Sequence, residues 1–212
     1  MRAKLGAGVL DSLRPISPFF GGIGICEKTG VDDSRPTPKK SEIGRRESSS
    51  PAPNFALTDE SGKPFKFTAA SGKFVLVTFV YTTCPDVCPL FTARLASIQR
   101  ILEAENRDDY LLLTITTDPA RDTPAKMKAY AQAFHADFRR WHFLSGSHEA
   151  LAQVWKKFGV AVRDLGNGQI QHTNLTTLID PQGTRRVDYY GDKWHEKEIL
   201  KDLTRLRQAR PQ

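Results

Sequence analysis

Two cysteines, Cys84 and Cys88, stand four residues apart in a proline-containing segment, residues 83–89. Their type and spacing indicate chemistry more clearly than any other feature of this 212-residue chain. Pro89 suits the first position of a helix, which would make Cys88 the residue that caps it. The unpaired N–H groups and the helix dipole at that end stabilise an anion, so we expect the Cys88 thiolate to be favoured.

The spacing of the pair leaves both a disulfide and a metal site open. On a regular helix, Cβ atoms four residues apart are about 5–6 Å from each other, whereas a disulfide needs roughly 3.5–4.5 Å. The prolines make the segment a loop that closes this gap only with local adjustment. Two thiolates on one soft ion, Cu(I) or Zn(II), need less adjustment, and imidazole suits either metal as a third ligand. A zinc ribbon would need a second cysteine pair, and only Cys26 is left. Inert buried cysteines are disfavoured, because prolines and an aspartate surround the pair.

The chain has five histidines that offer such an imidazole. Four are better explained otherwise: two are expected to be exposed at helix ends, one lies in a predicted strand edge at 141–144, and one opens the last helix; these are His135, His148, His142 and His195. His172 lies in a polar loop, 166–173, just before a predicted strand. The residues alone leave the third ligand open, with His172 favoured.

Two carboxylates accompany the cysteines. Asp86 lies between them, where its charge should oppose thiolate formation or contact a partner. Asp118 follows the second buried strand, on the same rim of the sheet as the cysteines. It is expected to cap a turn, or to support the metal ligands or contact a partner from the second shell of the site.

The elements that position these residues follow from hydrophobic patterning. Residues 74–81 (FVLVTFVY) form a nearly continuous apolar run, typical of a strand buried on both faces. Further strands are predicted at 110–116, 174–179 and 185–190, and helices at 89–105, 124–134, 147–158 and 196–208. Residues 55–58 and 64–67 flank a Ser-Gly turn and predict an N-terminal β-hairpin. This order predicts an α/β fold, a central mixed sheet with helices on both faces.

Composition separates residues 1–50 from residues 51–212. The first segment is rich in Gly, Pro and Ser without periodicity and is predicted to be a disordered leader or linker. Its stretch 16–26 faintly resembles a signal peptide, but Ile25 stands where a lipoprotein signal needs a small residue before Cys26. A start site that omits an upstream anchor is an equal alternative. No run approaches 18 apolar residues, so no transmembrane helix is predicted. The net charge of +7 is spread out, which disfavours nucleic acid as a partner.

Three segments together resemble one known family. Residues 83–89 (TCPDVCP), 118–124 (DPARDTP) and 171–173 (QHT) with 178–183 (LIDPQG) resemble, in the same order, the conserved segments of the Sco/SenC proteins. The resemblance covers about residues 55–206. It departs from the family pattern at Thr173, where serine is common, and in the lack of a clear anchor.

The resemblance implies a thioredoxin-like fold and a role in cytochrome c oxidase assembly. It implies that Cys84, Cys88 and His172 bind one copper, Cu(I) or Cu(II), and that the cysteines form a redox-active disulfide. It further implies a metallochaperone rather than an enzyme, which takes copper from a donor protein and passes it to the copper-accepting subunit of the oxidase or another copper apoprotein. The expected location is periplasmic or membrane-associated.

Two alternatives belong to other classes. A thiol–disulfide oxidoreductase that reduces the cysteines of a copper-site apoprotein needs only the cysteine pair. A peroxide-reducing enzyme on the same fold would pair one reactive cysteine with a nearby Thr83 and Arg121, but the proline-flanked pair fits that chemistry poorly.

Overall fold

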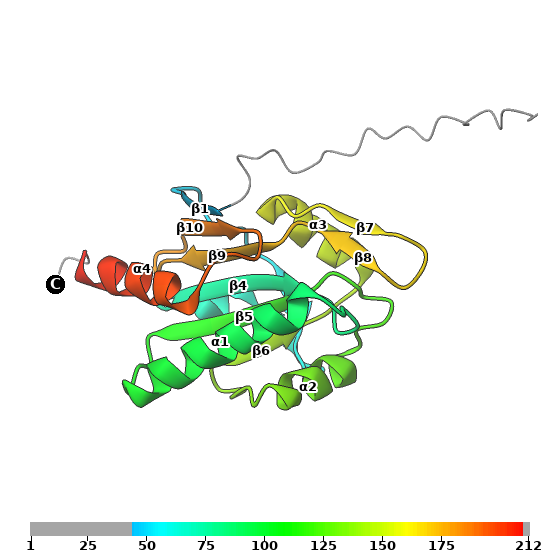
Figure 1. Cartoon of the computed structure of the whole chain (residues 1–212), viewed down its shortest axis with the longest axis horizontal. Helices are drawn as coiled ribbons and strands as arrows, with labels where there is room; N and C mark the ends of the chain where they lie inside the picture. Colours follow the sequence, from blue (N-terminus) through cyan, green and yellow to red (C-terminus); the bar gives the residue numbers. More distant parts are fainter. Residues whose placement is uncertain (1–43, 210–212) are drawn as a thin grey trace, which may run out of the picture. The chain divides into compact units, whose positions relative to one another are not determined.

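The computed structural model describes residues 44–209, and a six-stranded mixed sheet in the order β1-β10-β9-β4-β5-β6 forms its centre (Figure 1). The strands of this sheet are β1 (Gly44–Glu47), β4 (Phe74–Val80), β5 (Tyr110–Thr116), β6 (Trp141–Leu144), β9 (Leu175–Ile179) and β10 (Arg185–Tyr190). Strands β4, β5 and β6 run parallel, and β9 and β10 complete the sheet as antiparallel neighbours. The predicted signal-like stretch 16–26 and Cys26 lie outside the described residues.

Strand β4 is buried on both faces, as its apolar run predicts. Phe74 and Leu76 point into one core cluster, while Val75, Val77 and Phe79 point into the other. This division follows from the two-residue period of a strand. Strand β4 therefore forms the centre of both cores and fixes where the loop that follows it emerges.

Helices cover both faces of the sheet, which confirms the predicted layer arrangement. The helices are α1 (Val87–Ala104), α2 (Pro124–Ala133), α3 (His148–Phe158) and α4 (Glu196–Gln208), with a short 3₁₀ turn η2 (Phe67–Ala70). Side chains of α1, α2 and α4 enter one core, and those of α3 enter the other. In Figure 1, α1 crosses in front of β5.

Two small hairpins stand outside the central sheet. The N-terminal hairpin was predicted and pairs β2 (Ala56–Thr58) with β3 (Pro64–Lys66). The second pairs β7 (Val162–Asp164) with β8 (Ile170–His172). Residues 166–173 were predicted as a polar loop, which is wrong for their second half, because β8 pairs back onto β7. His172 therefore sits on a strand rather than in a loop.

The ordered sheet begins before the predicted boundary at residue 51. Strand β1 lies within the segment assigned to the leader, yet it pairs antiparallel with β10 from Gly44 to Glu47. Arg45 adds a two-pronged contact to the Asp202 carboxylate of α4, with both N–O distances at 2.7 Å. Polar sequence at an exposed edge strand hides such a pairing, because each residue of β1 is exposed and leaves no apolar alternation.

No helix among residues 44–209 combines the length and apolar character that crossing a bilayer requires.

Candidate metal centre

The cysteines lie where β4 hands over to α1, at the carboxyl edge of the parallel strands. Open α/β sheets place their ligand sites at this edge. The helix begins at Val87 with Asp86 as its capping residue, so the prediction that Cys88 caps the helix is wrong. Cys88 instead occupies the second helical position, because the chain turns into the helix before Pro89.

Both cysteines are free thiols and both are buried. Cys88 is completely inaccessible and Cys84 is 8% exposed. They share a small cluster with Val80, Tyr81 and Ile170. The sulfurs are therefore shielded on most sides, and a metal or partner approaches them through Cys84.

Strand β8 brings His172 to the cysteine pair. Its Nε2 lies 3.9 Å from the Cys88 sulfur, although 84 residues separate the two in the sequence. Nδ1 lies 3.1 Å from the Thr173 carbonyl oxygen. Because a carbonyl only accepts, Nδ1 carries the proton, and the lone pair on Nε2 faces the sulfur. Burial lowers the pKa of His172, which also favours the neutral, metal-binding imidazole.

The two thiols differ strongly in acidity. A hydrogen bond from Cys88 lowers the pKa of Cys84 to about 5, against burial, and the backbone N–H groups of Cys88 and Asp86 add to the effect. The same hydrogen bond, together with burial, raises the pKa of Cys88. The expectation that Cys88 carries the favoured thiolate is thus wrong. Position in the first helical turn matters less than which sulfur receives the hydrogen bonds.

Sequence reasoning missed Tyr81, which closes β4 immediately before the cysteine loop. Its hydroxyl hydrogen-bonds to Cys84, and its ring meets the ring of His172 edge-on with centroids 6.1 Å apart. Only its position as the last residue of the run 74–81 pointed to the site. Tyr81 contacts two of the three predicted ligands.

The predicted carboxylates occupy different surroundings. Asp86 is exposed and reaches Cys84 through its backbone N–H. Asp118 is 3% exposed, and its carboxylate pairs with Arg121. A third carboxylate, Asp122, was not singled out. It is 1% exposed and accepts hydrogen bonds from the hydroxyls of Thr82, in the cysteine loop, and of Thr116.

The remaining histidines stay away from the cysteines. His135, His148 and His195 are exposed. His142 lies in β6 with its Nδ1 3.6 Å from the Glu60 carboxylate, and these two residues with Asp59 bring ligand-type atoms within 4.8 Å of one another. Within residues 44–209, the ligand atoms of Cys84, Cys88 and His172 do not all meet that limit, so a shared ion requires a side-chain rotation.

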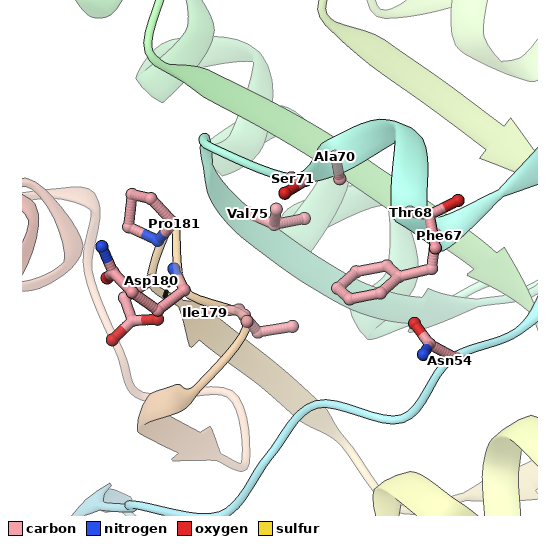
Figure 2. Close-up of a pocket in the computed structure, with 11 residues that line it drawn as sticks. Asn54, Phe67, Thr68, Ala70, Ser71, Val75, Ile179, Asp180 and Pro181 are labelled. Carbon is pink, nitrogen blue, oxygen red and sulfur yellow. Dashed lines mark hydrogen bonds between the residues drawn. The ribbon is translucent and has the colours of Figure 1, made fainter.

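A cavity of about 330 Å³ opens at the other edge of the sheet (Figure 2). Its walls come from η2, the start of β4 and the end of β9, with Phe67, Ala70, Val75, Ile179 and Pro181 among them. Neither cysteine nor histidine lines it. The soft donors of the chain therefore gather at the carboxyl edge, away from this cavity.

The fold and the site together define a thioredoxin-like dithiol protein whose cysteine pair faces a histidine. The SCO1/SenC family model matches residues 44–208, and the chain belongs to this family. An SCO2-like protein of Rickettsia typhi is 34% identical over 155 residues, covering 70% of this chain and 74% of the relative.

Solved structures give the same result. A SCO1/SenC family lipoprotein from Bacillus anthracis superposes with a TM-score of 0.69 at 31% identity, covering 77% of this chain and 97% of that one. Bradyrhizobium japonicum ScoI, solved with copper bound, superposes with a TM-score of 0.64 at 31% identity, covering 74% of this chain and 99% of that one. These structures confirm the predicted thioredoxin-like fold.

Proposed function

We propose that this protein carries copper as cargo for the assembly of cytochrome c oxidase, with Cys84, Cys88 and His172 as the ligands of one ion. The supporting observation is the approach of His172 Nε2 to the Cys88 sulfur at 3.9 Å, at the same edge as Cys84. Two thiolates and an imidazole form a donor set suited to copper. Relatives described as copper-bound or as cytochrome c oxidase assembly proteins support the same cargo and role.

The partially exposed side of the site fits delivery rather than storage. Cys88 and His172 hold the ion from within, whereas Cys84 faces the approach route. A partner's thiolate replaces Cys84 first, so that the ion passes by stepwise ligand exchange. The acceptor is a copper-site apoprotein, for which the oxidase subunit is the leading candidate, and the donor is a second copper protein. The corresponding location is periplasmic or on a membrane facing that compartment.

The test is an anaerobic copper titration of the reduced protein beside His172→Ala and Cys84→Ser. We expect one copper per chain in the wild type and a thiolate-to-Cu(II) charge-transfer band. His172→Ala should lose this band and weaken binding about 10- to 100-fold, since it removes a ligand. His148→Ala is the matched control, because that histidine is exposed. Full stoichiometry and affinity in Cys84→Ser would sink the proposal.

A second function is favoured by the unequal acidity of the thiols. Cys84 attacks as a thiolate, and the neighbouring Cys88 then resolves the mixed disulfide. Two electrons pass from the pair to the partner's disulfide, which becomes a dithiol while Cys84 and Cys88 become oxidised. A His172→Ala variant that keeps full cellular function would favour this reductase role over copper carriage, because His172 is not needed for exchange.

A further inference from the structure

The β7–β8 hairpin carries His172 but is weakly attached to the rest of the fold. It forms a two-stranded sheet of its own, without backbone pairing to the central sheet. Isolated two-stranded hairpins are marginally stable. At its base, Thr173 and Ala161 exchange hydrogen bonds, and Ile170 packs beside the cysteines. The placement of His172 therefore depends on what holds the outer part of this hairpin.

Arg121 reaches that outer part from the opposite side of the site. Its Nη1 faces Gly168 in the hairpin turn, 3.7 Å from where a Cβ on that glycine would lie. Asp164, the last residue of β7, attracts the same guanidinium. Arg121 belongs to the segment 118–124, which the sequence analysis singled out and to which the proposed function gives no task.

Asp118 fixes the direction of the Arg121 side chain. The Asp118 carboxylate accepts from Arg121 Nε and is itself buried, at 3% exposed. Asp118 is anchored in turn by its N–H, which donates to the Thr116 hydroxyl at 2.9 Å. Arg121 Nη2 is buried and lacks a hydrogen-bond partner among the described residues. One edge of the guanidinium is therefore held by the rim of the sheet, and the remaining nitrogens are directed away from Asp118.

We propose that Asp118 and Arg121 form a clamp that holds the β7–β8 hairpin against the cysteine loop and so keeps His172 beside Cys88. Arg121 is a positioning residue, because it acts on the site through the hairpin and touches none of the three ligands. The clamp rests on the proposed function only in its effect on copper. Its effect on the hairpin is a property of the copper-free protein.

The first measurement is hydrogen exchange of the reduced, copper-free protein, wild type beside Arg121→Gln. The informative amides are those bonded within or below the hairpin, such as Leu165, which donates to Gln169, and Thr173. A partly exposed ion pair has a modest effect, so we expect protection there to fall about 3- to 5-fold while β4 and β5 amides stay unchanged. The control is Arg163→Gln, which removes the same charge from an exposed position on β7.

The second measurement reads the metal site. Arg121→Gln should speed copper release about 3- to 5-fold and shift the thiolate-to-Cu(II) band, whereas Arg163→Gln should match the wild type. Asp164→Asn should reproduce the effect of Arg121→Gln, and the double variant should add little to either, since both remove one contact.

The outcomes separate the clamp from the proposed function. Hairpin exchange in Arg121→Gln equal to that in Arg163→Gln overturns the clamp, and so does an equal loss of protection throughout β4, β5 and the hairpin. If the wild type shows no copper band that depends on His172, the proposed function fails, while the exchange data on the copper-free protein still decide the clamp.

Discussion

At the scale of single residues, the site is organised by which sulfur receives hydrogen bonds. Cys84 accepts from the Cys88 thiol, from Tyr81 and from backbone N–H groups, and its pKa falls to about 5. The pKa of Cys88 is raised. Near neutral pH the reduced pair therefore holds one thiolate and one thiol. Copper binding by both sulfurs then releases the proton of Cys88.

We expect one thiolate to appear per chain as the pH of the reduced, copper-free protein rises through about 5. A lowered pKa stabilises the fold above the ordinary value of 9.0 and loses that effect as the pH falls through about 5. The free energy of unfolding, relative to Cys84→Ser, should therefore rise between these limits. Above 9.0 the raised pKa of Cys88 acts in the opposite direction. Ultraviolet thiolate absorbance and denaturant unfolding check both statements. A midpoint near 9.0 in the wild type would contradict them.

At the scale of elements, one buried carboxylate ties the cysteine loop to the sheet. Asp122 precedes α2 and accepts from the N–H and hydroxyl of Thr82 and from the hydroxyl of Thr116, at the end of β5. Burial raises the pKa of Asp122 despite these bonds. The ends of two strands and the start of a helix are thereby fixed relative to one another.

Asp122→Ala should lower the free energy of unfolding by about 2–4 kcal/mol, because it leaves buried donors without an acceptor. Asp122→Asn keeps part of the hydrogen bonding and should cost about half as much. Urea unfolding of the reduced protein measures both. Asp108→Ala is a suitable control, since that aspartate is exposed. Equal stability of Asp122→Ala and the wild type would show that the loop is held by other contacts.

At the scale of the whole described chain, both ends of the ordered fold meet through Asp202. This carboxylate, in α4, accepts from Arg45 of β1 and from the Tyr189 hydroxyl of β10. Its side chain is only 7% exposed. The first strand and the last helix are therefore coupled, although the cysteine site lies at a different edge of the sheet.

A chain shortened to begin at Pro51 should fold but lose about 2–4 kcal/mol of stability, because it gives up the β1–β10 ladder and leaves the Asp202 charge unpaired. Its copper affinity should match that of the full chain. Arg45→Gln in the full chain separates the charge effect from the ladder and should account for about half of the loss. Thermal unfolding and copper titration, run side by side, test this. Weakened copper binding in the shortened chain would link β1 to the metal site.

The sequence determined the layers and the identity of the candidate ligands. Apolar runs such as 74–81 and 110–116 have one structural solution, a strand buried on both faces, because every side chain along them needs cover. The segments around Cys84, Cys88 and His172 carried enough residue types in order to indicate the family. Local signals of this kind survive in a sequence because they depend on neighbours along the chain.

The tertiary structure alone decided the relations between distant residues. The edge strand Gly44–Glu47 has no pattern of its own and exists through its partner β10. The acidity of Cys84 over Cys88 depends on hydrogen bonds that form only when the loop closes. The position of Arg121 against the hairpin likewise joins segments that nothing in their spacing connects. Hydrogen bonds and ion pairs depend on distances in space, and these are fixed only once both cores have packed.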